Sequence, residues 1–186
     1  MAGLTSLGIE HDYRGLALPR EQHAAVRFGL DAHELIVEVD APYFGDPAPA
    51  GPAGPTERLW EYEVCELFIA DAGEHYLEIE LSPHGQHLVL ELQGVRNAVR
   101  TRLPIAYSAS IEVAAQAQGQ VRGRYRGSAR VPAAYLPARP TRANAYLIHG
   151  SGADRAYHAH SPPQGTAPDF HRLECFVPFR WAADAL

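Results

Sequence analysis

The sequence predicts an all-β fold in which two antiparallel sheets pack together as a β-sandwich. Short stretches recur in which apolar and polar residues alternate, as in strands that bury one face. Turns rich in Gly and Pro separate these stretches, and hardly any segment has the helical period of about 3.6 residues. A chain of 186 residues is long enough for one hydrophobic core, so we expect a single domain over residues 1–186.

The N-terminal third of the sequence predicts a hairpin, a long loop and a strand. The hairpin pairs residues 26–30 with 35–40 around the polar turn 31–34. Residues 42–55 contain five Pro and three Gly, a density that no regular element tolerates, so we expect a loop that is either disordered or a flap over something. A strand rich in aromatic and branched residues follows at 58–70 and ends at the turn 71–74.

Two strands near the middle of the sequence, 75–81 and 87–93, alternate most clearly. In the first, the residues that point one way are Leu77, Ile79 and Leu81, and those that point the other way are Tyr76, Glu78 and Glu80. In the second, Leu88, Leu90 and Leu92 alternate with His87, Val89 and Glu91. Further strands are expected at 105–114, 120–131, 144–149 and 173–179, and one helical turn at 132–137.

The pairing of strand 58–70 with strand 75–81 decides which side chains share the polar face. If Ile69 lies opposite Leu77, the apolar residues of both strands enter the core together, whereas a shift by one residue sets Leu67 against Glu78. The first register is therefore expected. It places on the polar face Glu66, Phe68, Tyr76, Glu78 and Glu80, to which the third strand would add His87 and Glu91.

This acidic face is typical of the solvated exterior of a sandwich, and it is also compatible with a ligand groove or with paired catalytic carboxylates. Opposed Cβ atoms on neighbouring strands lie about 4.5–5.5 Å apart, near the carboxylate separations of roughly 5–9.5 Å in glycosidases. Clustered glutamates favour the groove, because like charges destabilise a sheet unless Arg, a metal ion or substrate hydroxyls meet them. Arg124 and Arg126 are candidate partners within the chain.

Composition excludes several classes of function. The net charge of −6 argues against binding to nucleic acid or to an anionic membrane, both of which need a basic surface. All 16 basic residues are Arg, so neither a Schiff-base lysine nor a P-loop lysine can be present. The start of the chain resembles no secretory signal and no segment is apolar enough to span a membrane. With Cys65 and Cys175 far apart and expected to be reduced, we predict a cytoplasmic protein.

Three segments together resemble the DOMON-like superfamily, which includes the family 9 carbohydrate-binding modules. Residues 59–69 read Leu-Trp-Glu-Tyr-Glu-Val-Cys-Glu-Leu-Phe-Ile, residues 76–85 read Tyr-Leu-Glu-Ile-Glu-Leu-Ser-Pro-His-Gly, and residues 169–176 read Asp-Phe-His-Arg-Leu-Glu-Cys-Phe. The strings Pro-His-Gly-Gln-His at 83–87 and Ile-His-Gly at 148–150 are similar to small stand-alone members of that superfamily.

The resemblance implies a jelly-roll sandwich that binds sugar at an aromatic-lined site, in some members with a structural calcium ion. Fold transfers between such relatives more safely than function does. Other members bind haem through a Met or Lys ligand. The only Met here is Met1 and Lys is absent, which leaves a bis-His haem site as the open alternative.

We therefore expect a non-catalytic domain that binds a saccharide or small polyol, with no cofactor other than the calcium ion that the resemblance implies. Exposed aromatic rings stack on the apolar faces of sugar rings, and charged groups bind the hydroxyls. The expected ligand-binding residues are Trp60, Tyr62, Glu66, Tyr76, Glu78, Glu80, His84, His87, His149, His171 and Arg172.

Three alternatives remain open from the sequence. The first is an enzyme acting on a sugar or small metabolite, with Glu78 or Glu80 and His87 or His149 as acid and base. The second is a metal- or haem-binding protein; its zinc version would combine the His84/His87 pair with Glu80 or His149. The third is an interaction domain whose outer face meets another protein.

Overall fold

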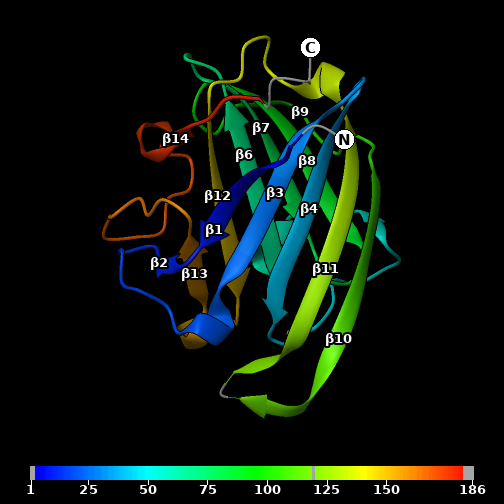
Figure 1. Cartoon of the computed structure of the whole chain (residues 1–186), viewed down its shortest axis with the longest axis vertical. Coiled ribbons are helices and arrows are strands. Elements are labelled where there is room, and N and C mark those ends of the chain that lie inside the picture. Colours follow the sequence, from blue (N-terminus) through cyan, green and yellow to red (C-terminus); the bar gives the residue numbers. More distant parts are fainter. Residues whose placement is uncertain (1–2, 119, 182–186) are drawn as a thin grey trace.

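Two β-sheets face each other in the computed structural model, which describes residues 3–118 and 120–181 (Figure 1). The first sheet has five antiparallel strands in the order β1-β3-β4-β11-β10. Their bounds are Thr5–Ile9 for β1, Ala24–Asp31 for β3, Glu34–Tyr43 for β4, Ala106–Gln118 for β10 and Val121–Pro132 for β11.

The second sheet has nine strands, in the order β2-β13-β12-β6-β7-β8-β5, with β14 on β12 and β9 on β8. Their bounds are His11–Asp12 (β2), Gly54–Pro55 (β5), Val64–Ala70 (β6), His75–Leu81 (β7), Gln86–Gln93 (β8), Ala98–Arg100 (β9), Arg142–His149 (β12), Ala156–Ala159 (β13) and Val177–Pro178 (β14). Within the described ranges, only the short β5–β8 pair is parallel, and no α-helix occurs. Short 3₁₀ turns lie at Arg20–Gln22 (η1), Leu59–Glu61 (η2), Ala133–Tyr135 (η3), Gly152–Asp154 (η4) and Leu173–Cys175 (η5).

The predicted all-β antiparallel sandwich is confirmed, and most of its strands lie where alternation placed them. The strand predicted at 173–179 is wrong over most of its length, because the chain first makes the turn η5 and then pairs only at β14. Pro178 has no N–H to extend that ladder. The sequence did not predict β1, β2, β5, β9 or β13, each of which has five residues or fewer and carries too little periodic signal.

The main hydrophobic core lies between the two sheets. Ile69 pairs with Leu77, the register expected from the sequence, and the inward-pointing residues of β6 and β7 meet Phe28, Val37 and other apolar residues of the five-stranded sheet. Trp181 packs against Phe28 at one end of this core, with ring centroids 6.0 Å apart. These contacts hold β6 and β7 side by side and send their other side chains to the outer face of the nine-stranded sheet.

A second apolar cluster covers that outer face. Phe68, Tyr76 and Tyr146 from the strands pack under η2 and under the segment that leads from β13 to η5. Leu88, Leu90 and Leu92 belong to this second cluster, because β8 pairs Leu90 with Glu78 and Leu88 with Glu80. His87 and Glu91 therefore face the opposite side, and their predicted place on the glutamate face is wrong. A sheet buried on both faces carries no alternation rule for which apolar row faces its partner sheet.

The Pro-rich segment 42–55 is attached at both ends. The Glu63 carboxylate accepts backbone N–H groups from Phe44 at 2.8 Å and from Gly45 and Asp46 at 3.1 Å. Burial raises the pKa of Glu63 to about 7 in spite of these hydrogen bonds. At its other end the segment forms β5 beside β8, at the edge of the nine-stranded sheet.

Candidate functional site

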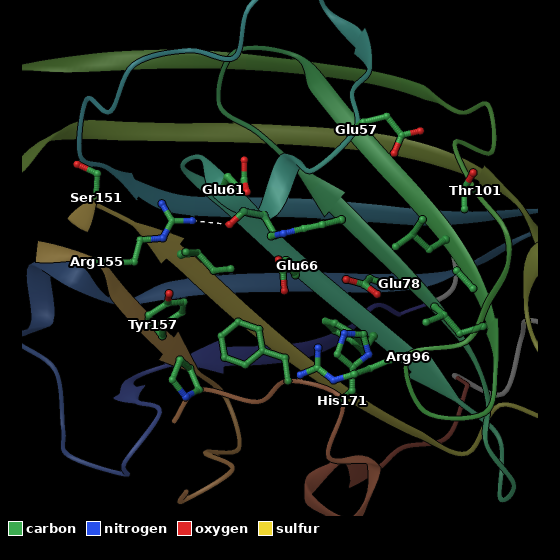
Figure 2. Close-up of a pocket in the computed structure, with 18 of the residues that line it drawn as sticks. Glu57, Glu61, Glu66, Glu78, Arg96, Thr101, Ser151, Arg155, Tyr157 and His171 are labelled. Atoms are coloured by element: carbon green, nitrogen blue, oxygen red, sulfur yellow. Dashed lines mark hydrogen bonds between the residues drawn. The ribbon is translucent and has the colours of Figure 1, made fainter. Parts of the chain in front are cut away.

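A cavity of about 690 Å³ lies over the outer face of the nine-stranded sheet (Figure 2). Its floor comes from β6, β7 and β8, and its rim from η2, the segment around Arg96 and the segment from Ser151 to Tyr157. Aromatic side chains form much of the wall: Trp60, Phe68, Tyr157, Phe170 and His171. The charged lining consists of Glu57, Glu61, Glu66, Glu78, Arg96 and Arg155.

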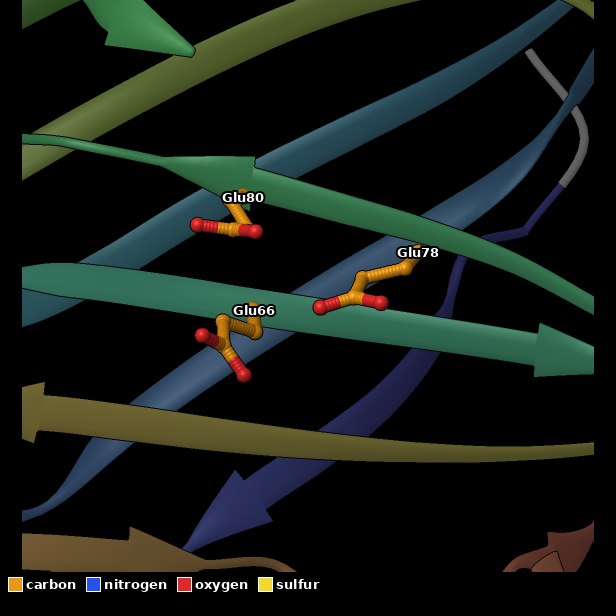
Figure 3. Close-up of side chains that lie close together, drawn as sticks. All are labelled: Glu66, Glu78 and Glu80. Atoms are coloured by element: carbon orange, nitrogen blue, oxygen red, sulfur yellow. The ribbon is translucent and has the colours of Figure 1, made fainter. Parts of the chain in front are cut away.

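Three glutamates gather at the floor because of the β6–β7 register. Glu78 and Glu80 are two residues apart on β7 and share a face, and Glu66 on β6 lies directly opposite Glu80. Figure 3 shows the three carboxyl groups on one side of these neighbouring strands. Each contributes an oxygen, and these oxygens lie within 4.8 Å of one another. We call Glu66, Glu78 and Glu80 the glutamate triad.

The triad is buried and poorly partnered. The exposed fractions are 2% for Glu66, 4% for Glu78 and 0% for Glu80. Both carboxyl oxygens of Glu80 and one of Glu78 make no hydrogen bond of good geometry among the described residues, and the backbone N–H of Trp60 is a nearby donor to Glu80. An unpaired buried carboxylate is strongly disfavoured, so such groups stay protonated or require a counter-charge.

Burial is the main cause of raised pKa values in the triad. It raises the pKa of Glu78 to about 8, while the positive charge of Arg96 opposes the rise. Burial and the neighbouring Glu78 raise the pKa of Glu66 well above its ordinary value. Burial, Glu66 and Glu78 do the same to the pKa of Glu80, while the backbone N–H of Trp60 opposes the rise. Protonated carboxyl groups at neutral pH can donate as well as accept hydrogen bonds.

Two arginines line the cavity but make their hydrogen bonds elsewhere. Arg155 donates to the carbonyl oxygens of Gly150 at 2.6 Å and Tyr62 at 3.3 Å, and also to that of Trp60 (dashed line in Figure 2). Arg96 forms an ion pair with Asp169 at 2.8 Å. The guanidinium groups thus tie the rim together and leave the triad without a direct cationic partner among the described residues.

A hydrogen-bond chain holds His171 at the wall. The Tyr76 hydroxyl accepts the backbone N–H of Arg96 at 2.9 Å and shares a hydrogen bond of 2.8 Å with Nδ1 of His171. Burial, followed by the charge of Arg96, lowers the pKa of His171 to about 4, so the ring is neutral near pH 7. The neutral ring has one N–H, and in the tautomer in which Nδ1 accepts the Tyr76 proton, Nε2 is a hydrogen-bond donor.

A second cavity of about 430 Å³ adjoins the first and shares Glu61 and Ser151 with it. Its lining includes Tyr62 and His149. The His149 ring stacks on Phe44 with centroids 3.4 Å apart and planes inclined by 3°. Burial and the neighbouring His158 lower the pKa of His149 to about 3, so this ring is also neutral at physiological pH.

The sequence is similar to proteins of one family over most of its length. Over 182 residues it is 39% identical to the UPF0462 protein C4orf33 of Homo sapiens, covering 93% of this chain and 86% of the human protein. The homolog from Danio rerio is 40% identical over 92% of this chain and 86% of its own length, and that from Rattus norvegicus is 44% identical over 84% and 80%. The chain belongs to the UPF0462 family.

The fold of this UPF0462 protein also occurs in a solved structure. A proposed carbohydrate-binding protein from Bacteroides uniformis superposes with a TM-score of 0.67 over 94% of this chain and 85% of its own. The two sequences are only 12% identical, so the likeness shows the fold alone. No family model matches the sequence, and the resemblance to the DOMON-like superfamily stays a prediction. Among the described residues, no helix is long and apolar enough to cross a membrane.

The structure divides the residues that the sequence singled out. Trp60, Glu66, Glu78 and His171 line the larger cavity, with Tyr76 and Glu80 directly beneath it. Tyr62 and His149 line the smaller cavity instead.

Three of the expected ligand-binding residues neither line a cavity nor lie directly beneath one. His84 makes an edge contact with Tyr43, and His87 faces Tyr107 on the other side of the sheet from Glu80, so the expected zinc set is not assembled. Arg172 binds Glu174 and the carbonyl of Pro163. Arg124 and Arg126 lie in the other sheet, where both pair with Asp40, so their expected role as partners of the glutamates is wrong.

Sequence reasoning missed Arg96, Arg155, Tyr157 and Phe170. Arg96 lies in a turn with φ of 60°, and Arg155 follows the glycines Gly150 and Gly152, both with positive φ. Neither position belongs to a periodic pattern, and the two glycines were the single hint of a tight loop near the site. Short loops carry binding residues without a local signal of their role.

Proposed function

We propose that this UPF0462 protein binds a saccharide or small polyol in the larger cavity. The observation that carries the proposal is the glutamate triad, which places buried and partly unpartnered carboxyl groups at the floor of an aromatic-walled cavity. Small-molecule sites typically have this composition, a largely apolar wall with a few converging polar groups.

Hydroxyl groups are the partners that suit this floor. A protonated carboxyl group donates one hydrogen bond and accepts others, and a hydroxyl does the same, so each can satisfy the other. The neutral ring of His171 adds a polar group on the wall, and Glu61 adds an acceptor at the rim. A polyhydroxylated ligand would thus replace water at groups that the protein leaves unpaired.

The indole of Trp60 supplies a stacking surface. It lies on η2 at the cavity rim with 41% of its surface exposed, one of the few large apolar side chains that are. The C–H face of a sugar ring packs well on such an aromatic face. The fold similarity to the proposed carbohydrate-binding protein from Bacteroides uniformis supports the same class of ligand.

Calorimetric titration with neutral and acidic mono- and disaccharides tests the proposal. We expect a dissociation constant of about 10–100 µM for the best ligand, as one stacked ring and several water-exposed hydrogen bonds would provide. Trp60→Ala should weaken binding about three- to tenfold, because the stacking contribution is lost.

The matched control is Leu16→Ala, which removes another exposed apolar side chain outside both cavities and should leave the affinity unchanged. If no saccharide in the set binds at millimolar concentration, the proposed function is wrong. Equal affinity of wild type and Trp60→Ala would mean that the ligand does not use this rim.

Acid–base catalysis is the second candidate, and the raised pKa of Glu78 favours it. A carboxyl group protonated at neutral pH beside a second carboxyl group is the arrangement that glycosidases use, with the closer pairs about 5–5.5 Å apart. The expected partners His87 and His149 do not line this cavity, so Glu66 would take their place. Slow cleavage of a bound oligosaccharide, abolished in Glu78→Gln, would establish it; a stable complex favours binding alone.

The cytoplasmic location and the lack of a nucleic-acid partner stay predictions from the sequence.

A further inference from the structure

We propose that Glu66, Glu78 and Glu80 together bind one divalent cation of the hard, oxygen-preferring class to which Ca²⁺ belongs, at the floor of the larger cavity. Its role as a bridge to ligand hydroxyls rests on the proposed function. Binding of the cation itself does not depend on a saccharide.

The spacing of the triad suits one shared ion. One oxygen from each carboxyl group lies within 4.8 Å of the other two. Ca²⁺ binds oxygen at roughly 2.3–2.6 Å, so two oxygens on opposite sides of the ion are about 5 Å apart and neighbouring ones are closer. Carboxylate-only ligands favour a hard cation over Zn²⁺, which prefers His and Cys.

A second observation points to a missing partner. Glu80 is fully buried, and neither of its carboxyl oxygens makes a hydrogen bond of good geometry in the described part of the chain, although the backbone N–H of Trp60 lies near enough to favour the ionised form. One oxygen of Glu78 likewise makes no such hydrogen bond. Native proteins rarely leave buried polar atoms unpaired, and such atoms commonly mark a bound ion, a water molecule or a functional group.

A cation binds the triad in its ionised form, and an ionised triad gives the cavity an excess of negative charge. Five carboxyl groups lie in or under it, those of Glu57, Glu61 and the triad, against the guanidinium groups of Arg96 and Arg155. Arg96 is paired with Asp169, and Arg155 is held by backbone carbonyl groups. A divalent cation at the triad would supply the positive charge that these arginines do not deliver to it.

Three carboxylates do not complete the shell of such an ion. Ca²⁺ takes six to eight oxygen ligands, and the triad supplies three to six of them, depending on how many carboxylates bind through both oxygens. Glu66 and Glu78 line the cavity, so the remaining positions face the space where the ligand would lie. A vicinal diol would fill two of those positions.

The test is a titration of chelator-stripped protein with CaCl₂ by calorimetry, with Tb³⁺ luminescence as a second probe of the same site. We expect one saturable Ca²⁺ site per chain. Glu80→Gln and Glu66→Gln, which keep the side-chain shape and remove one charge, should each weaken it at least tenfold. Glu74→Gln, an exposed residue in the β6–β7 turn, is the matched control and should bind like wild type.

Parallel titrations with MgCl₂ and ZnCl₂ show which class of cation the site prefers. Zn²⁺ binding that is unchanged in Glu80→Gln takes place at another site. The absence of saturable Ca²⁺ or Mg²⁺ binding up to about 10 mM, or equal binding by wild type and Glu80→Gln, would overturn the inference. Circular dichroism and urea midpoints show that each variant is folded before it is titrated.

Saccharide titrations with and without chelator separate this inference from the proposed function. Saccharide binding in the chelated protein together with no cation binding would refute the cation site and leave the proposed function standing. Cation binding without any saccharide binding would do the reverse. A saccharide affinity that rises at least severalfold when Ca²⁺ is added is the result expected if both hold.

Discussion

Wild-type protein is expected to lose stability in acid faster than the variant His149→Phe. The difference between their free energies of unfolding should change by about 1.4 kcal/mol for each pH unit as the pH falls from about 6.5 towards 3. The neutral His149 ring stacks on Phe44 and makes no side-chain hydrogen bond to the described residues. The variant therefore loses none. Phe preserves the stack and cannot bind a proton.

The sign follows from the pKa of the ring in the two states. Burial, then the charges of His158 and Arg155, lower the pKa of His149 to about 3 in the folded protein, against 6.5 for an ordinary His. Between these values the unfolded chain binds a proton that the folded protein does not, so stability is fully present above pH 6.5 and is lost as the pH falls. His158, with its pKa lowered to about 4, acts in the same direction in both proteins.

Urea unfolding at pH 7, 6, 5 and 4, followed by Trp fluorescence, measures the effect. Glu63 and the triad have raised pKa values, so they oppose the loss of stability in acid between pH 4.5 and 8. Their contributions are the same in wild type and variant and cancel in the difference. His33→Phe, at an exposed turn position, is the control and should parallel wild type. A constant difference between wild type and His149→Phe across this range would show that His149 is not buried as described.

Phe68→Ala is expected to lower the free energy of unfolding by about 3–5 kcal/mol, as much as a substitution in the main core. Phe68 is fully buried although it lies on the outer face of its sheet. Its ring packs against those of Tyr146, His171 and Phe176, with centroids 5.4, 5.5 and 5.8 Å apart. Removing it leaves a void at the cavity wall and takes away one packing contact of His171.

Phe28→Ala, in the core between the sheets, is the matched comparison, and Leu16→Ala at the exposed surface should change stability by less than about 0.5 kcal/mol. Urea denaturation gives all three values. A loss below about 1 kcal/mol for Phe68→Ala would mean that the second cluster is not a packed core. Phe68→Leu, a milder change, keeps the comparison possible if Phe68→Ala does not fold.

Local alternation accounts for the parts of the site that the sequence predicted. On β7, the period of two residues separates Leu77, Ile79 and Leu81 from Glu78 and Glu80, and burial of the apolar row determines the register with β6. That register brings Glu66 opposite Glu80. The triad is thus a consequence of two neighbouring strands and one turn, all within 20 residues of each other in the sequence.

Whether this face is exterior or enclosed depends on residues far away in the chain. The second apolar cluster includes Tyr146, Phe170, Leu173 and Phe176, and together with η2 these cover part of the sheet and leave the cavity between them. The pairing of β8 with β7 places its leucines on the face of the glutamates and His87 on the other face, and both faces of β8 are buried. No pattern along β8 distinguishes these two orientations.

The sequence by itself determined the sandwich, the register of β6 and β7 and the shared face of the three glutamates, because each depends on alternation within a few neighbouring residues. Only the tertiary structure decided that the glutamates are buried, that Tyr62 and His149 line a separate cavity, and that Arg96 and Arg155 form the rim. Those features arise where loops from distant parts of the chain converge, and the free energy that places them comes from long-range packing, which leaves no period in the local sequence.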